Sequence, residues 1–451
     1  MFKKPLRTFL LCFVPLLAAG CSTALLNGDR VTVFFSNDIR GEFENCGCAG
    51  VQLGGLSRKA RLFRAQEAKC PGMLRLDAGN LLFGKRPARD FEARELLLKA
   101  DYIVSAYNAM GCDAFNISEN DLLLGMSALE QLRGRAKFPF LSSNILSRDS
   151  GSPVFEPWVI KKIGEVTVAV LGVCPPDGAF IPELRVEDPA AAVRSSMEAL
   201  RGRSDFIVVL SGLGLELDRD LARRVPGIGM IISARSDRLM EQPIVENGTT
   251  IVQAFNRGQY VGRADIQRKG KTFSVTSRLI PLEPDMGEEQ TIVMLGNEYK
   301  AQVNAMNRRS FSSGTPGARA AESRAGYAGS DACAACHVLQ YESWRVTPHA
   351  RAYQTLAGKN AQYRSECLAC HTTAFGEPGG FSPSQENSPM ANVQCEACHG
   401  PAGGHAGAEN PPVRNAGKEI CLGCHTEKNS PKFDYATYLP LVICPKGGTS
   451  H

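Results

Sequence analysis

The sequence predicts a layered α/β domain followed by a small domain of short helices and irregular loops. Two observations lead to this fold class. Between residues 29 and 284, short β-branched and apolar runs alternate with stretches that carry a helical period of apolar residues. From residue 327 onward the chain is rich in Gly, Pro, Ala and Asn, has no sustained period, and repeats the sequence Cys-x-x-Cys-His.

Length and charge limit the classes of protein to consider. With 451 residues, the chain exceeds the size at which a single core usually stops growing, so we expect more than one domain. A composition of 43% hydrophobic and 22% charged residues is that of a globular protein. The net charge of +5 is small and mixed in sign, so we expect no nucleic-acid partner.

The N-terminus has the pattern of a secretory signal over residues 1–20. Basic residues precede the apolar run "FLLCFVPLLAA", which is too short to span a bilayer. The run ends in "LAAGC", which resembles the lipobox of bacterial lipoproteins, where the cysteine, here Cys21, carries the lipid. Ser22 resembles the outer-membrane sorting pattern. We expect an outer-membrane lipoprotein, facing the periplasm or the cell surface, with residues 21–28 as its tether. An ordinary cleaved signal with an accidental cysteine is the alternative.

Residues 29–284 are expected to form one domain of sheets covered by helices. Strands are predicted at residues 31–35, 72–79, 112–118, 138–145, 166–173, 205–214, 228–234 and 249–255, and helices at 93–111 and 188–204. Residues 285–326 are expected to hold one helix, over 286–310, and then a polar linker.

The segment 327–451 contains four Cys-x-x-Cys-His motifs, which is the signal for c-type haem attachment. In such a motif two thiols bond to the vinyl groups of one porphyrin, and the histidine becomes the proximal iron ligand. The cysteines are Cys333, Cys336, Cys367, Cys370, Cys395, Cys398, Cys421 and Cys424, and the histidines are His337, His371, His399 and His425. Zinc knuckles and redox pairs also use Cys-x-x-Cys, but four copies that all end in His favour haem. We expect four covalently bound haem c groups, which would also supply the apolar core that this segment lacks.

The histidine distribution limits the iron ligands. The chain has seven histidines, and none precedes residue 337. After the proximal four, His349, His405 and His451 remain as distal candidates, so at most three irons can be bis-histidine. His349 and His405 could instead be exposed surface histidines. His451 is the last residue of the sequence, and disorder is the default at a chain end. Met390 is an alternative axial ligand or a packing residue.

The segment resembles the tetrahaem cytochromes c that carry electrons from hydroxylamine oxidation. The resemblance lies in "YAGSDACAACH", "SWRVTPHARAYQTLAG", "ECLACHTTAFGEPGGF", "VQCEACHGPAGGHAG" and "CLGCHTEKNSPKFDYATYLPLV". It implies closely stacked haems, mostly bis-histidine, with one iron lacking a strong sixth ligand, and redox proteins as partners. Where that family tends to have a late histidine, this chain has "LVICP", so Cys444 is a weak candidate ligand.

The N-terminal domain resembles the metallophosphoesterase domain of 5′-nucleotidase-like periplasmic proteins. The resemblance lies in "FFSNDIRGE", "LRLDAGNLLFG", "MGCDAFNIS", "VVLSGLG", "VPGIGMIISARSD" and "IVQAFNRGQYVGRADI". The positions that match the family's two-metal site hold Asp38, Arg40, Gly79, Asn80, Ser118, Glu119, Asn120, Asp121, Gly212, Arg235 and Asp237. Every histidine of that site is replaced.

Two of the replacements are arginines, which would place fixed positive charge where the family holds cations. We therefore expect no phosphoesterase activity and assign no catalytic residue. Asp38, Asp121 and Asp237 could still ligate one hard ion, although turn and cap roles suit them better. A basic cleft that binds an anion, or a docking surface, is the alternative use of the domain.

Five cysteines remain: Cys46, Cys48, Cys70, Cys112 and Cys174. In an exported protein we expect some pairing, most simply Cys46 or Cys48 with Cys70. A thiolate metal site at the first two is the alternative.

Three functions from different classes follow from the sequence. The first is electron transfer by a lipid-anchored tetrahaem cytochrome, with the inactive α/β domain as scaffold or docking platform. The second is an oxidoreductase that reduces a small nitrogen or sulfur species at one open haem. The third is a residual phosphoesterase or nucleotide-binding protein, which the lost ligands disfavour.

Overall fold

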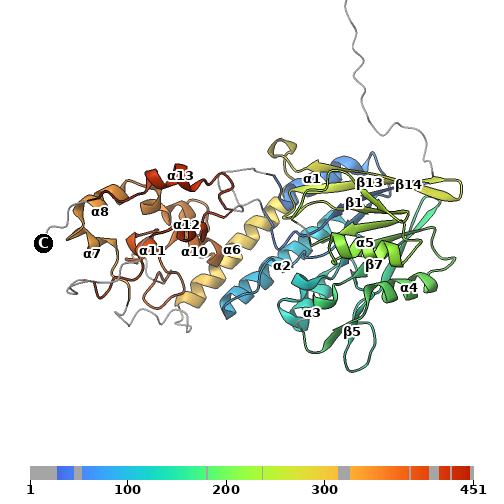
Figure 1. The fold of residues 1–451 in the computed structure, drawn as a ribbon, viewed down its shortest axis with the longest axis horizontal. Helices are drawn as coiled ribbons and strands as arrows, with labels where there is room; N and C mark the ends of the chain where they lie inside the picture. Colours follow the sequence, from blue (N-terminus) through green and yellow to red (C-terminus); the bar gives the residue numbers. More distant parts are fainter. Residues whose placement is uncertain are drawn as a thin grey trace, which may run out of the picture.

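The computed structural model describes residues 28–44, 53–178, 181–235, 237–312, 326–384, 388–405, 416–426 and 429–446. The signal peptide, Cys21, Cys46, Cys48 and His451 lie outside these residues. Figure 1 shows an α/β part on one side, a group of short helices on the other, and the long helix α6 (Gln290–Ser312) extending between them.

The α/β part is built on two six-stranded sheets. The first has the order β14 (Thr272–Pro281), β13 (Tyr260–Lys269), β1 (Arg30–Ser36), β2 (Leu74–Asp77), β3 (Ala114–Asn116) and β4 (Phe140–Leu141). The second has the order β11 (Ile244–Glu246), β12 (Thr249–Val252), β10 (Met230–Ser233), β9 (Phe206–Ser211), β7 (Val166–Val173) and β6 (Trp158–Ile163). A further pair joins β5 (Ile145–Ser147) to β8 (Leu184–Val186). The middle strands run parallel. Antiparallel strands form both edges of the second sheet and one edge of the first, whose other edge is the parallel strand β4.

Three apolar clusters hold these layers together. One lies between the sheets, where Val33 and Leu76 of the first sheet share a core with Val170 and Leu210 of the second. The outer face of the first sheet is covered by helices, which are α1 (Leu56–Glu67), α2 (Asp90–Met110), α3 (Gly125–Arg135) and α6. The outer face of the second sheet is covered by α4 (Pro189–Ala199) and α5 (Leu215–Arg224).

Local sequence explains the helix ends. Asp188 caps α4 by accepting a hydrogen bond from the Ala191 N–H, and Pro189 occupies the first helical position. Helix α2 ends at Gly111, whose φ of 68° is the left-handed conformation that glycine adopts without strain. Short 3₁₀ turns connect other elements; they are η1 (Glu119–Leu122), η2 (Pro176–Gly178) and η3 (Pro284–Met286).

The C-terminal part consists of short helices and turns. They are α7 (Ser330–Ala334), α8 (Val338–Arg345), η5 (Pro348–Arg351), α9 (Gln354–Ala357), α10 (Ser365–His371), α11 (Cys395–His399), α12 (Lys418–Leu422), α13 (Tyr435–Tyr438) and η6 (Leu439–Leu441). The fold class predicted from sequence, a layered α/β sandwich followed by a small, mostly helical and irregular region, is confirmed. None of the helices in the described ranges combines the length and the apolar character needed to cross a membrane.

Candidate functional site

Each of the four Cys-x-x-Cys-His motifs lies on a helical turn. The second and third motifs are within α10 and α11, and the first and fourth extend past the ends of α7 and α12. The His337 N–H donates to the Cys333 carbonyl at 2.8 Å, and the His425 N–H donates to the Cys421 carbonyl at the same distance. Since residues three apart are neighbours on a helical surface, each pair of sulfurs faces the same side.

Motifs that are distant in sequence are neighbours in space. The side chains of Cys333 and Cys395 interact, which brings the first motif close to the third. The side chains of Cys370 and Cys398 both interact with that of Cys424, which brings the fourth motif close to the second and the third. The four motifs therefore lie close together in space.

Two histidine pairs have the separation expected across an iron. The ring centroids of His337 and His405 are 5.9 Å apart, and those of His349 and His425 are 6.1 Å apart. Because metal–imidazole bonds are about 2 Å long and the bonding nitrogen lies about 1 Å from the ring centre, two imidazoles on one metal have centroids about 6 Å apart. The pairs His337–His405 and His349–His425 thus fit bis-histidine ligation of a haem iron at the first and fourth motifs.

The second ring nitrogen of two proximal histidines is held in place by polar partners. His371 Nδ1 lies 2.7 Å from the Ala352 carbonyl oxygen, to which it can only donate. His425 Nδ1 lies 3.1 Å from Ser430 Oγ. Such bonds orient the ring and leave Nε2 for a metal. Burial lowers the pKa of His425, and burial together with His425 lowers the pKa of His349, so both favour the neutral form that ligates.

The other ligand candidates are placed differently. Among the described residues, His371 and His399 have no histidine ring facing them at such a separation. Met390 is 2% exposed and packs in an apolar cluster with Leu368 and Phe381. Cys444 lies close enough to Cys395 for the two thiols to interact electrostatically, and burial raises the pKa of Cys444. Cys444 is therefore near Cys395 of the third motif.

In the α/β part, several loops meet where parallel strands end. Asp38 follows β1, Asn80 follows β2, Asp121 follows β3 and Arg235 follows β10. The carboxyl ends of strands are where α/β sheets usually place their ligands. Asp38, Asn80 and Arg235 have positive φ values of 51°, 54° and 62°. Such backbone conformations in non-glycine residues are characteristic of functional loops.

Arginine side chains fill this meeting point. Arg40 lies 2.9 Å from Asp237 and 3.6 Å from the fully buried Asp38. Arg235 lies 3.3 Å from Glu119 and 3.1 Å from Asp177. The guanidinium groups are thus paired with four carboxylates, so their charge is already compensated. The expected alternative of a basic, anion-binding cleft gains no support from this arrangement.

The carboxylates of these loops are used internally. Asp38 accepts hydrogen bonds from Asn80 Nδ2 at 2.9 Å and from the Arg235 N–H at 2.7 Å. Asp121 accepts from the N–H groups of Asn80, Leu82 and Ser118 at 2.8–3.0 Å, and burial raises the pKa of Asp121 to about 7. Across the part of the chain that the structure describes, no group of three or more His, Cys, Asp or Glu is arranged to hold a metal.

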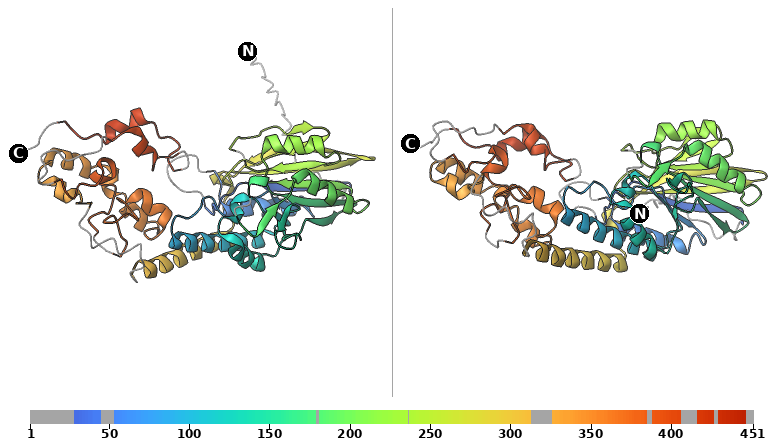
Figure 2. Two further views of the ribbon diagram at one scale, coloured as in Figure 1. Left: turned by 60° about the horizontal axis from the view of Figure 1, so that its bottom comes forward. Right: turned by 90° about the horizontal axis from the view of Figure 1, so that it is seen from below.

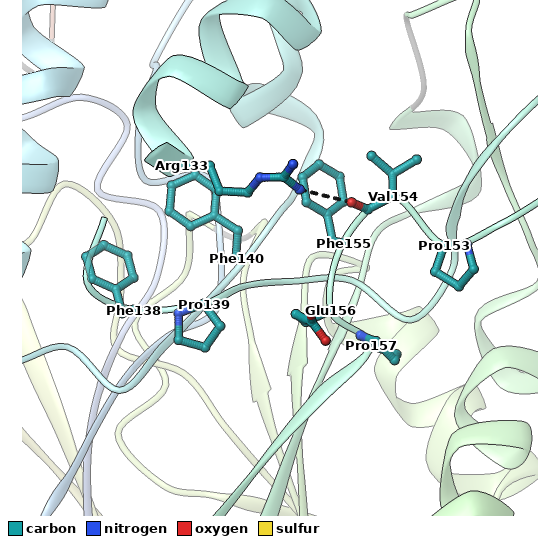
Figure 3. A pocket seen from close by; sticks show the side chains of 9 residues that line it. All are labelled: Arg133, Phe138, Pro139, Phe140, Pro153, Val154, Phe155, Glu156 and Pro157. Carbon is teal, nitrogen blue, oxygen red and sulfur yellow. Dashed lines mark hydrogen bonds between the residues drawn. The ribbon is translucent and has the colours of Figure 1, made fainter. Parts of the chain in front are cut away.

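A cavity lies away from these loops. Its volume is about 530 Å³, and it lies between the end of α3, strand β4 and residues 153–157. Figure 3 shows the aromatic rings of Phe138, Phe140 and Phe155 around it, and Arg133, which donates to the Val154 carbonyl at 3.0 Å. No residue of the arginine-filled loops lines this cavity.

Comparisons with known proteins agree with both halves of the chain. Residues 332–400 match the family described as "Cytochrome c554 and c-prime", and residues 387–430 match "Doubled CXXCH motif". Protein UshA of Escherichia coli is 25% identical over 334 residues, which cover 61% of this chain and 60% of UshA. A 5′-nucleotidase of Vibrio cholerae is 27% identical and covers 58% of this chain and 55% of its own length.

The chain joins a 5′-nucleotidase-like domain to cytochrome c domains. Among solved structures, the 5′-nucleotidase precursor of Thermus thermophilus has a TM-score of 0.54 at 23% identity, covering 61% of this chain and 59% of that one. The sulfate thiohydrolase SoxB of the same genus has a TM-score of 0.53 at 20% identity, covering 60% of both chains. These structures show that the fold is shared. The chain spans between about half and three fifths of its curated relatives, since the shares are 52–60% for the first five.

The 5′-nucleotidase-like domain thus shares the fold of these proteins, and in its strand-end loops the arginine and carboxylate side chains neutralise one another. Sequence reasoning identified Arg40, Arg235, Asp38 and Asp237 as neighbours, but it missed Asp177, whose place beside Arg235 depends on η2. The sequence indicates this position only through an acidic residue, Asp177, that follows two prolines.

Replacing Arg40 with Met should destabilise the 5′-nucleotidase-like domain by about 1–3 kcal/mol, because it leaves the buried Asp38 carboxylate without its cation. Denaturant unfolding would measure this loss. The matched control is Arg201→Met, whose side chain is 77% exposed and pairs with Glu198 on the surface. That control should change stability by less than about 0.5 kcal/mol. Equal effects of both substitutions would contradict the stabilising role given to Arg40. Phosphodiester turnover by the unaltered protein with added manganese would contradict the expected lack of phosphoesterase activity.

Proposed function

We propose that this protein is a tetrahaem electron carrier, exported and anchored by lipid on Cys21, whose 5′-nucleotidase-like domain is catalytically inactive. The observation that carries the proposal is the pair of histidine separations, 5.9 Å for His337–His405 and 6.1 Å for His349–His425. When bound, haem supplies an iron that alternates between ferric and ferrous states. Electron transfer is the function that these domains support, with redox proteins as partners.

The side chains have separate roles in this proposal. Eight cysteines would hold four macrocycles, and the four motif histidines would be the proximal ligands. His405 would be the second ligand at the first motif, and His349 would be the second ligand at the fourth. The contacts of Cys333 with Cys395 and of Cys370 with Cys424 keep neighbouring attachment sites close, which suits transfer between them.

The inactivity of the 5′-nucleotidase-like domain rests on its arginines. A dinuclear centre stabilises the attacking and leaving oxygens between two cations. Here Arg40 and Arg235 are bonded to carboxylates, and the described residues offer no set of metal ligands in their place. We therefore assign the domain a supporting role.

A second candidate function is reduction of a small nitrogen or sulfur species at an open iron. It is favoured by the absence, within the described ranges, of a histidine facing His371 or His399. Cys444 lies beside the third motif, which leaves the second motif as the stronger candidate for an open position.

We expect His405→Ala and His349→Ala each to convert one low-spin haem to high-spin, because each removes one distal imidazole. Electron paramagnetic resonance and optical spectra of the purified full chain would measure the change. Met390→Leu is the control, since Met390 packs in an apolar cluster and a volume-conserving substitution should leave all spin states unaltered. Unchanged spectra for both histidine variants would contradict the assigned pairs.

The unaltered protein should show at least one high-spin haem if the second candidate function is correct. An open iron would bind nitric oxide or a similar small ligand with a spectral change. Four low-spin haems that do not respond to such a ligand would exclude this function.

The lipid anchor predicts that Cys21→Ser releases the protein from membranes. The acyl chains on Cys21 are the only attachment that we propose, so their loss should move the protein to the soluble fraction. Labelling with radioactive palmitate, followed by fractionation, would measure both lipid and location. Cys112→Ser is the control, because Cys112 is a thiol of the folded domain. Membrane retention of the Cys21 variant would contradict the anchor.

A further inference from the structure

The 5′-nucleotidase-like domain contacts the cytochrome region at the second haem motif. Helices α2 and α6 lie side by side in both views of Figure 2. Helix α10, which carries Cys367, Cys370 and His371, is bonded to α2, and the segment just before α10 is bonded to α6. The contact is polar at the start of α10 and aromatic beyond its end.

A charged pair links the two parts directly. Lys99 Nζ of α2 lies 3.0 Å from Glu366 Oε2 of α10, and the Lys99 side chain is only 10% exposed. Burial alone would lower the pKa of Lys99, but Glu366 together with Tyr299 and Glu42 outweighs burial and raises that pKa above its ordinary value. Arg364 also pairs with Glu366. Lys99 is therefore charged, and Glu366, the residue next to Cys367, forms ion pairs with two cations.

Hydrogen bonds fix the backbone that leads into α10. Glu95, which is 4% exposed, accepts from the Ser365 N–H at 3.2 Å and from Asn307 Nδ2 at 3.0 Å. Asn307 also donates to the Tyr363 carbonyl at 2.8 Å. Asn304 donates to the Asn360 carbonyl at 2.6 Å. Both α2 and α6 thus position the residues before Cys367.

Aromatic side chains hold the other end of α10. Phe375 follows His371 by four residues, and its ring centroid lies 6.1 Å from those of both Phe91 and Phe311. The Arg89 guanidinium lies 4.9 Å from the Phe375 ring centre. Helix α10, which carries the second haem motif, is therefore fixed at both ends by the neighbouring domain: polar contacts hold the residues before Cys367, and aromatic contacts hold Phe375. We call this set of contacts the clamp around α10.

We propose that the 5′-nucleotidase-like domain sets the redox potential of the haem attached at Cys367 and Cys370, through the Lys99–Glu366 pair that α2 forms with α10. This inference rests on the proposed tetrahaem function. A ferric haem carries one more positive charge than a ferrous haem, so a nearby negative charge stabilises the ferric form and lowers the potential. Charges shielded from water act more strongly than exposed ones. Lys99 offsets the Glu366 charge, so it acts as a positioning and charge-balancing residue.

The inference predicts opposite shifts for two substitutions. Lys99→Met removes the compensating cation while Arg364 keeps Glu366 ionised, so one of the four midpoint potentials should fall. Glu366→Gln removes the negative charge at nearly constant size, so the same potential should rise. Lys99→Arg should restore the unaltered value. Spectroelectrochemical titration of the purified full chain would measure all four potentials.

The matched control is Lys161→Met, because Lys161 pairs with Asp113 at the same 3.0 Å but between two elements of the 5′-nucleotidase-like domain. Its four potentials should equal those of the unaltered protein. Asn304→Ala is a second control, since it removes an interdomain hydrogen bond without changing charge. Comparing the potentials of Asn304→Ala with those of Lys99→Met distinguishes an effect of loosened packing between the domains from an effect of altered charge.

Haem content by pyridine haemochrome distinguishes the possible failures. A protein that lacks covalent haem at the second motif would contradict the proposed function and this inference together. Four haems with potentials that do not move, or that move in the same direction in Lys99→Met and Glu366→Gln, would overturn the inference alone. If Lys99→Met does not fold, Glu366→Gln decides, because a potential that fails to rise overturns the inference.

Discussion

The C-terminal part of this chain does not bury enough apolar surface to form a core of its own. Among the residues of this part that the structure describes, the buried apolar side chains form one small cluster, consisting of Leu356, Ala361, Leu368, Phe381 and Met390. Residues such as Val338, Val346 and Leu441 are 52–69% exposed. Large apolar cofactors are the natural complement to such a segment, as metals are for small metal-dependent domains. Cofactor attachment and folding would then be one process.

The sequence predicted the strands that are continuous apolar runs and missed those that carry many polar residues. Strands such as β7 and β9 are almost entirely buried, so they are apolar runs that are easy to recognise. Strand β13 lies inside the first sheet but was not predicted, because its sequence YVGRADIQRK includes several charged and polar residues. Strands β6 and β14 are half-buried or exposed along most of their length, and they were missed as well.

In the candidate site, local motifs could be predicted from the sequence, whereas pairs of residues that are distant in the chain could not. Motifs with fixed spacing, such as Cys367 to His371, can be recognised in sequence because the chemistry depends on local geometry. Which distal histidine serves which motif cannot be predicted this way, because His405 meets His337 only through the fold. The interdomain pair of Lys99 and Glu366 was also missed, since the two residues are 267 positions apart. Charge pairs at that separation leave no sequence pattern.

The clamp around α10 also sets an order of assembly. Helices α2 and α6 both precede the four motifs, so in a chain that is exported N-terminus first, their surface leaves the export channel before Ser365 does. The second motif would then meet a surface that is already present, while the first and third motifs must find each other without one. With haem attached as we propose, maturation of the sites would be unequal, and the second would be guided by the neighbouring domain.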